Sequence, residues 1–348
     1  MAKKSSRKTI SIREVARHAG VSVATVSRVL NDGPVHERTR RRVELAIRET
    51  GYLPDSRAAD LRRGQTRKIG LVMADLGNPA YTELTRTIHD ELVQQGYSLL
   101  LGCTYGREKE EVEVLKMFQR ERVDGVIVST CEGEEDPAAL EICEQLERHD
   151  VAIVFNGRDA NGLNAEVVSA DNIGGMQQLA AYLLRCGYQR MSFIAGEPRA
   201  RASRERLEGL CLGIKAAGKQ VNKILGDRVL CEGRYTIENG KFLALRMLQE
   251  KKPDVLVCGN DLMAAGALMA AENLGLRVPE DVAVCGFDDI YLAELVRPQL
   301  TTLRLPVEEV ARLMCQLLMA KINGKAEKGT PDQRLYRVKT QLVIRGSA

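Results

Sequence analysis

Polar side chains follow directly after several apolar runs of the kind that forms buried strands. Carboxylate, amide and guanidinium groups can each hydrogen-bond several hydroxyls, so as a set they suit a hydroxyl-rich ligand. Each of them alone is equally well explained as a helix cap or a surface ion pair. The residues are Asp75, Asn78, Asn156, Arg158, Asn260, Asp261, Asp288 and Asp289, together with Arg204 and Arg206 near the start of a predicted helix.

No set of residues has the spacing of an enzyme active site. The run GVSVA at 20–24 lacks the final glycine of a nucleophile elbow and follows a predicted helix instead of a strand. The segment 213–219 has most of a phosphate-binding loop, but Gln220 replaces the required serine or threonine. The four histidines are far apart, and the nine cysteines include no C-x-x-C pair. We therefore expect no catalytic residues, no metal or cofactor, and a reducing compartment for the thiols.

A long alternation of strands and helices, which begins at Lys68, must position the polar residues. Continuous apolar strands between amphipathic helices indicate parallel α/β sheets covered on both faces, here in two similar doubly wound series. In such sheets the ligand lies beyond the carboxyl ends of the strands, where these polar residues stand. The predicted strands are 69–76, 98–104, 123–130, 151–156, 190–195, 254–258, 281–286 and 335–346, and the predicted helices are 82–95, 108–119, 138–147, 173–186, 203–217, 236–249, 261–273 and 305–323.

The N-terminal part has a different pattern, in which two short helices flank a turn. Ser11 and Glu14 have the S-x-x-E spacing of a capping box, so a first helix is predicted over 12–19, with Gly20 in the turn. Ser22 is the N-cap candidate of a second helix over 23–30. Any helical hairpin has this outline, but small and hydroxyl side chains on the exposed face, with Arg28 able to read guanine, favour a DNA-binding helix-turn-helix.

The distribution of charge favours the same interpretation. Residues 1–68 contain 17 lysines and arginines against seven acidic residues, a net charge of +10, whereas residues 69–348 carry −6. A region this basic attracts a polyanion. A third helix over 37–50 completes a three-helix domain, and its run Arg40-Arg41-Arg42 is a candidate for phosphate contact. In the polar linker 55–68, Leu61 has no core to join and is a candidate for insertion into a minor groove.

Composition limits the class of protein. With 348 residues, 44% of them hydrophobic, the chain can form two or three domains with sizeable cores. The first nine residues are basic and polar, unlike a secretory leader, and no stretch approaches the ~18 apolar residues of a membrane helix. We expect a cytoplasmic protein that does not bind membranes.

Six stretches spread over nearly the whole chain form a specific combination. They are VSVATVSRVLN (21–31), TRRRVELAIRETGYLPDSRAADL (39–61), KIGLVMADLGNPAY (68–81), CGNDLMAAGAL (258–268), VAVCGFDDIYLAELVRPQLTTLR (282–304) and LVIRGS (342–347). In this order they resemble the lactose and galactose repressor family of bacterial transcriptional regulators. The resemblance implies an N-terminal helix-turn-helix, a hinge helix and a two-lobed core like a periplasmic sugar-binding protein, acting as a homodimer on palindromic operator DNA under the control of a small carbohydrate-like effector.

The resemblance also implies roles for single residues. The implied DNA contacts are Val23, Ala24 and Arg28 as base readers, Ser11, Ser22, Thr25, Ser27 and Asn31 at phosphates or as helix-positioning residues, and Leu61 as a minor-groove wedge flanked by Arg57 and Ala59. The implied effector contacts are Arg206 and Asp288, which grip sugar hydroxyls, with Asn156, Asn260 and the stacking residues Tyr81 and Tyr235.

Two features depart from the family pattern. Asn156 stands where some sugar binders have aspartate. Four arginines lie close in sequence to the predicted pocket, and unless they are only solvated they favour an anionic effector such as a sugar acid or sugar phosphate. These are Arg158, Arg199, Arg201 and Arg204.

We expect a DNA-binding domain at 1–53, a hinge at 54–67 and a core at 68–348. Within the core, the first lobe is expected at 68–160 and 296–330, and the second at 161–295 and 331–348. Because no heptad repeat follows the last predicted strand, a dimer is the simplest state. The alternative is a transport or chemoreceptor protein with the same sugar-binding core, which should have a secretory leader and no basic helical region.

Overall fold

The computed structural model describes residues 10–30, 32–52, 65–130, 136–325 and 334–348. The chain divides into two compact units, Met1–Thr66 and Arg67–Ala348, close to the predicted boundary at 68, and each unit is described by itself. Asn31, Arg57, Ala59 and Leu61 lie outside the described residues, so their predicted DNA contacts stay predictions. Among the described residues, no helix has the length and apolar character needed to cross a membrane.

The N-terminal unit contains the predicted helices α1 (Ile12–Ala19), α2 (Val23–Leu30) and α3 (Glu37–Thr50). The Glu14 carboxylate accepts a hydrogen bond from the Ser11 backbone N–H at 2.7 Å, as the capping box predicts, and a second one from the Ser11 hydroxyl at 2.9 Å. Gly20 ends α1 in the left-handed region at φ 60°, which a side chain rarely adopts. The apolar faces of the helices bury one small core, formed by Val15, Ala16, Ala19, Val26, Val29, Val43, Ala46 and Tyr52.

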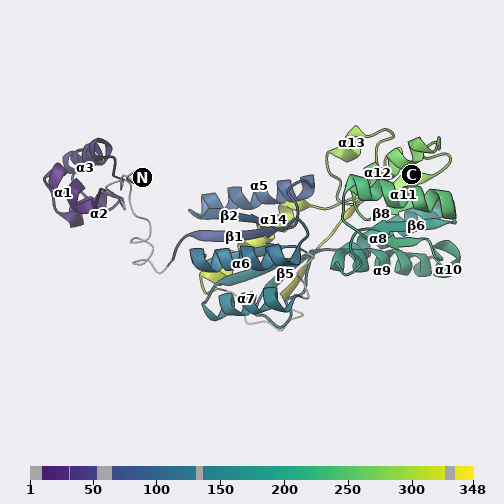
Figure 1. Ribbon diagram of the computed structural model, residues 1–348, viewed down its shortest axis with the longest axis horizontal. Coiled ribbons are helices and arrows are strands. Elements are labelled where there is room, and N and C mark those ends of the chain that lie inside the picture. Colours follow the sequence, from purple (N-terminus) through teal and green to yellow (C-terminus); the bar gives the residue numbers. More distant parts are fainter. Residues whose placement is uncertain (1–9, 31, 53–64, 131–135, 326–333) are drawn as a thin grey trace, which may run out of the picture. The chain divides into compact units, whose positions relative to one another are not determined.

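The first lobe of the second unit is a parallel sheet between two layers of helices (Figure 1). Its strand order is β11-β5-β4-β3-β1-β2, and side chains on alternate positions of β1 face opposite layers: Leu71 packs against α5 and α14, whereas Val72 packs against α6 and α7. The strands are β1 (Lys68–Met73), β2 (Ser98–Cys103), β3 (Gly125–Ser129), β4 (Ala152–Asn156), β5 (Glu166–Ala170) and β11 (Leu335–Val338), and the helices are α5 (Pro79–Gln94), α6 (Glu108–Glu121), α7 (Pro137–Arg148) and α14 (Val307–Ile322).

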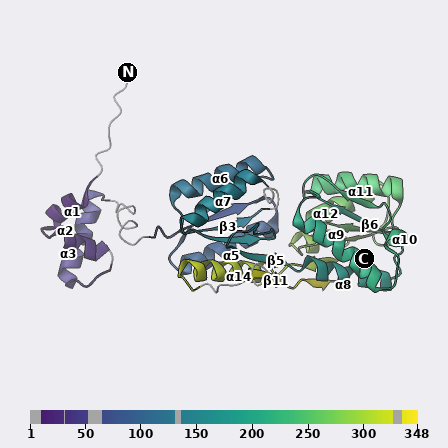
Figure 2. The ribbon, with the colours of Figure 1, turned by 90° about the horizontal axis from the view of Figure 1, so that it is seen from below.

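The second lobe has the same layered plan around a smaller parallel sheet of order β7-β6-β8-β9 (Figure 2). One core forms against α8 and α9, and the other against α11 and α12. The elements are α8 (Asn172–Arg185), β6 (Met191–Ala195), α9 (Arg201–Ala216), α10 (Val221–Ile224), β7 (Val229–Cys231), α11 (Ile237–Lys251), β8 (Val255–Cys258), α12 (Asp261–Asn273), β9 (Ala283–Cys285) and α13 (Leu292–Leu295), with an antiparallel pair of β10 (Thr302–Arg304) and β12 (Gln341–Val343).

The chain crosses between the lobes three times, after β5, after β10 and after β11. These crossings correct the expected lobe boundaries. Strands β5 and β11 pair with each other in the first lobe, although 161–295 and 331–348 were expected in the second. Strand β10 belongs to the second lobe, although the first was expected to resume at 296. The single strand expected over 335–346 is wrong, because the chain leaves one sheet after Val338 and joins the other at Gln341.

Candidate functional site

A pocket lies between the two lobes of the second unit, where the carboxyl ends of the parallel strands of both sheets meet. Residues at or just after the carboxyl ends of β1 to β5 line it from the first lobe, and residues that follow β6 to β9 line it from the second. The polar lining residues are Asp75, Asn78, Tyr81, Ser129, Asn156, Ser169, Asn172, Glu197, Arg206, Arg234, Tyr235, Thr236, Asn260 and Asp288. Of the residues predicted as effector contacts, the set includes Asp75, Asn78, Tyr81, Asn156, Arg206, Tyr235, Asn260 and Asp288, but not Arg158 and Arg204.

Arg206 and Asp288 come together on the second-lobe side of the pocket. Their side chains are each about nine-tenths buried, and Arg206 Nη2 lies 3.8 Å from Asp288 Oδ1. Arg206 Nε donates to Asn172 Oδ1 at 3.0 Å, and Nη1 donates to the carbonyl oxygen of Gly259. The guanidinium is therefore held from several sides before any ligand arrives, as a preorganised hydrogen-bonding site requires.

Both the backbone φ angle and the side-chain pKa of Asp288 are unusual. Its φ of 109° is rarely adopted by residues other than glycine. Burial raises the pKa of Asp288 to about 6, and this effect outweighs the charge of Arg206 and the hydrogen bond from Asn78, which lower it. Neighbouring Asp261 is also buried, and its burial and the charge of Asp288 raise its pKa well above the usual value. Its carboxylate accepts from the Thr302 hydroxyl at 2.6 Å, which ties α12 to β10.

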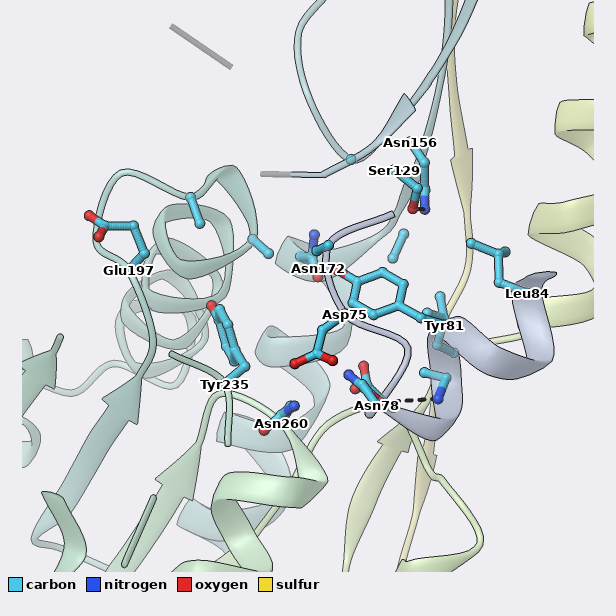
Figure 3. A pocket seen from close by; sticks show the side chains of 18 of the residues that line it. Asp75, Asn78, Tyr81, Leu84, Ser129, Asn156, Asn172, Glu197, Tyr235 and Asn260 are labelled. Carbon is cyan, nitrogen blue, oxygen red and sulfur yellow. Dashed lines mark hydrogen bonds between the residues drawn. The ribbon is translucent and has the colours of Figure 1, made fainter. Parts of the chain in front are cut away.

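Two tyrosines face the pocket from opposite lobes, Tyr81 from the first turn of α5 and Tyr235 from the loop after β7 (Figure 3). The Tyr235 ring lies against the ends of β6 and β8. A Cβ atom on Gly196 would lie 2.6 Å from this ring, and one on Gly259 would lie 2.8 Å from it, so both close approaches require glycine. The Tyr235 hydroxyl also hydrogen-bonds Ser203 on α9. Tyr235 thus has a fixed orientation from which its ring can stack on a ligand.

Charged groups of both signs line the pocket. Asp75, Glu197 and Asp288 are acidic, and Arg206 and Arg234 are basic. Arg234 Nη2 lies 3.2 Å from Asp75 Oδ2, an ion pair that joins the second lobe to the first.

The prediction that Arg158 contacts the effector is wrong, because Arg158 points into the first lobe and does not line the pocket. Its side chain is fully buried, its Nη1 lies 2.7 Å from Glu111 Oε1, and its guanidinium lies 5.0 Å from the Phe155 ring centroid. Gly157 at φ 70° turns the chain after β4, and the side chain that follows enters the core instead of the cleft.

Arg204 also lies outside the pocket lining, against the prediction, and its guanidinium donates to the carbonyl oxygen of Arg199. Helix α9 begins at Arg201, so Arg204 and Arg206 both belong to it. Residues two apart on a helix point about 200° apart, so only one of the two can face the cleft. Arg201 is held by Asp159 and Glu205. The four arginines that favoured an anionic effector are therefore absent from the lining, which removes the basis of that expectation.

Several lining residues were not predicted. Ser129 lies at the end of the strand predicted over 123–130, and Glu197 follows the one predicted over 190–195, so the strand-end rule that selected Asp75 could have found them. Asn172 begins α8 directly after a crossing between lobes, and Arg234 follows β7, a strand of only three residues that carries little pattern. Asn156 donates from its amide to the Ser129 hydroxyl at 2.8 Å, which brings the ends of two neighbouring strands together in the pocket.

In the N-terminal unit, α2 presents one face to solvent. Ser22, Val23, Ala24 and Arg28 are exposed, and Val26 and Val29 on the other side are buried. The Thr25 backbone N–H donates to the Ser22 hydroxyl at 3.1 Å, as the predicted N-cap requires. Thr25 and Ser27 are half-buried at the edge of this face, and Ser11 is exposed at the start of α1. A short helix with small side chains and one exposed arginine fits a major groove.

The run Arg40-Arg41-Arg42 has contacts within the unit. Arg42 donates to the carbonyl oxygen of Ala19 at 2.6 Å and so closes the end of α1. Arg40 Nη1 lies 3.1 Å from Asp32 Oδ1, and Arg41 Nε lies 3.0 Å from Glu37 Oε1. The contacts of Arg40 and Arg42 tie α3 to the turns on either side of α2, a role for these two that the sequence pattern did not indicate.

Family models match both units of the chain. The model for bacterial regulatory proteins of the lacI family matches residues 11–55, and the model for a periplasmic binding protein-like domain matches residues 180–348. The ribose operon repressor of Escherichia coli (strain K12) is 32% identical over 343 residues, which cover 97% of this chain and 99% of that protein. The transcriptional repressor PurR of Vibrio vulnificus (strain CMCP6) is 30% identical over 338 residues, covering 96% of this chain and 97% of that repressor.

Solved structures extend the similarity to the fold. The lac repressor dimer bound to operator and the anti-inducer ONPF has a TM-score of 0.83 and 26% identity, covering 98% of this chain and 99% of that one. The complex of the transcriptional regulator CelR with cellobiose has a TM-score of 0.72 and 29% identity, covering 97% of this chain and 100% of that one.

Proposed function

Because the chain belongs to the lacI family of bacterial transcriptional regulators, we propose that it is a repressor controlled by a neutral, polyhydroxylated effector such as a sugar. In this proposal α2 of each protomer reads one half of a palindromic operator, and the pocket between the lobes binds the effector. The effector acts by having different affinities for the conformations that bind and do not bind DNA.

The proposal of a neutral effector rests on the charged side chains that line the pocket. Three carboxylates line it against two guanidiniums, and one of these guanidiniums is already paired with Asp75. A sugar acid or sugar phosphate would need unpaired cations there. Carboxylates, amides and one fixed arginine instead suit hydroxyl groups, which both donate and accept. The rings of Tyr81 and Tyr235 offer apolar faces for the C–H face of a sugar.

A thermal-shift screen tests this choice. The panel contains D-ribose, cellobiose and other neutral sugars beside ribose 5-phosphate, glucose 6-phosphate and gluconate, since a ribose operon repressor and a cellobiose-bound regulator are similar to this chain. We expect stabilisation by a neutral sugar and none by its phosphate or acid. A shift with only the anionic members contradicts a neutral effector, and the same sugar should change the affinity for an operator selected from random duplexes.

We also propose a homodimer in which α11 and α12 contribute to the interface. Phe242 on α11 is 58% exposed and Met269 on α12 is 44% exposed, and large apolar side chains at such exposure favour a protein contact. The similar lac repressor structure is a dimer. Sedimentation of the full chain should give a dimer, and Phe242→Glu should shift it toward monomer and weaken operator binding.

We infer that the protein catalyses no reaction on its effector and works in the cytoplasm, where operator DNA is found. The Asp288 carboxylate faces Arg206 in a preformed binding arrangement, and the lining residues fit reversible binding. A bound sugar should therefore be recovered unchanged after prolonged incubation with the protein.

A further inference from the structure

Glu205 does not line the pocket, yet its carboxylate is buried beside it with three partners. It accepts from Asn172 Nδ2 at 2.8 Å, from Arg201 Nε at 2.9 Å and from Arg337 Nη1 at 3.4 Å. The side chain is 9% exposed. A buried carboxylate with this many donors has little freedom to rotate, so it restricts the orientation of the side chains that donate to it.

The hydrogen bond from Asn172 to Glu205 determines which atom of the Asn172 amide faces Arg206. A carboxylate only accepts and a guanidinium only donates, so one orientation of the Asn172 amide satisfies both neighbours. In this orientation Nδ2 donates to Glu205, and Oδ1 accepts from Arg206 Nε at 3.0 Å. Glu205 therefore acts on Arg206 through Asn172, although it does not touch the guanidinium that faces the pocket.

The other partners of Glu205 lead to the first lobe. Arg337 belongs to β11, directly before the chain crosses to β12, and Asn172 follows directly after the crossing from β5 to α8. The two crossings are adjacent, since the Asp171 backbone N–H donates to the carbonyl oxygen of Val338 at 2.8 Å. Arg201 also pairs with Asp159 of the first lobe. A rotation between the lobes would change the contacts of Glu205 on both sides.

We propose that Glu205 is a positioning residue that couples the orientation of the lobes to Arg206 through Asn172. When Arg337 and Arg201 hold the carboxylate, the Asn172 amide is fixed and Arg206 is presented to the pocket. When rotation of the lobes moves these arginines away, the Asn172 amide can rotate and its hydrogen bond with Arg206 weakens, so the guanidinium of Arg206 becomes more mobile. The importance of this coupling for effector control rests on the proposed function, but the coupling itself is a property of the protein without effector.

The test follows the Nε–Hε signal of Arg206 by NMR in the full chain labelled with ¹⁵N-arginine, without any sugar. Arg206→Lys identifies the signal. In the wild type we expect slow exchange with solvent, since the group is buried and hydrogen-bonded. Glu205→Gln should speed the exchange about tenfold, the effect of losing one buried hydrogen bond to a charged group. Arg337→Gln should speed it by a smaller factor, whereas Glu208→Gln, an exposed glutamate on the same helix, should leave it unchanged.

The outcomes separate positioning from simple stabilisation. A Glu205→Gln protein that melts at lower temperature but keeps the wild-type exchange of Arg206 overturns the proposal, because Glu205 then only stabilises the fold. Unchanged exchange in Arg337→Gln overturns the coupling to the first lobe. Arg337 is 39% exposed, so this variant should fold and tests the coupling even where Glu205→Gln does not. Failure of every sugar to bind would contradict the proposed function and leave these results standing.

Discussion

The guanidinium of Arg206 stacks on the ring of Phe287, with 3.6 Å between its central carbon and the ring centroid. The next residue, Asp288, lies beside the same guanidinium, with 3.8 Å between Arg206 Nη2 and Asp288 Oδ1. Two consecutive residues after β9 thus support the arginine on its flat face and at its edge. A planar cation held in this way keeps its remaining donors directed into the pocket.

Phe287→Leu should weaken effector binding by removing the stacking surface. Desolvated contacts between arginine and an aromatic ring contribute about 1–2 kcal/mol, so we expect roughly a five- to thirtyfold loss of affinity in calorimetric titration with the sugar selected by the screen. Phe193→Leu is the matched control, because Phe193 is fully buried in the same core as Phe287, the one that packs against α8 and α9 in the second lobe. Both variants should lose stability, and an equal loss of affinity in both would show that stacking on Arg206 is unimportant.

Asp288 should make stability depend on pH. Its folded pKa of about 6 lies above the usual 3.8, so the folded protein keeps a proton that the unfolded chain has lost. The free energy of unfolding should therefore fall as pH rises through this interval. Asp288→Asn removes the titration, and its stability relative to the wild type should rise over the same interval, by up to about 3 kcal/mol in urea unfolding.

Asp281→Asn is the control for this titration. Its hydrogen bonds from Arg277 lower the pKa of Asp281 to about 2, so its stabilising contribution is lost only when the medium becomes more acidic than the interval in which Asp288 titrates. The difference in the free energy of unfolding between Asp281→Asn and the wild type should stay nearly constant over the interval in which Asp288 titrates. A constant difference for Asp288→Asn as well would mean that Asp288 ionises like an exposed aspartate.

Local pattern was enough to predict most helices and strands and the residues that follow them. Helix α12 begins and ends where predicted, because Asn260 caps it by accepting a 2.9 Å hydrogen bond from the Met263 N–H and because nearly all residues between this cap and Asn273 are apolar. Likewise Asp75 and Asn260 were found because strand ends in parallel sheets point to one edge.

Long-range pairing accounts for the errors. Nothing in the run at 335–346 indicates that its halves join different sheets, because the partners of Tyr336 and Leu342 are Val168 and Leu303, which are far away in sequence. Arg158 was misplaced for a similar reason. Its partner Glu111 lies on α6, and only the folded first lobe brings a buried carboxylate within reach of it.

Gly196→Ala should displace Tyr235. The added Cβ would lie 2.6 Å from the ring, and Gly259 already approaches its other edge, so the ring must leave its position. We expect a loss of stability of about 1–3 kcal/mol, typical of overpacking, together with weaker sugar binding. Near-ultraviolet circular dichroism follows the change, since the chain contains tyrosine and no tryptophan. Gly346→Ala, whose Cβ would make an ordinary 3.5 Å contact, should behave like the wild type in both measurements.

Arg28→Ala should reduce the affinity for the preferred operator by about 1–3 kcal/mol and relax the preference at one base pair, because an exposed arginine on α2 can bind guanine through two hydrogen bonds. Binding to duplexes with every base at each position measures both effects. Arg148→Ala is the control, since Arg148 is exposed on α7 of the second unit and pairs with Glu144. An equal loss on operator and random DNA would assign Arg28 to a phosphate, in which case the sequence must be read by Val23 and Ala24 or by the linker.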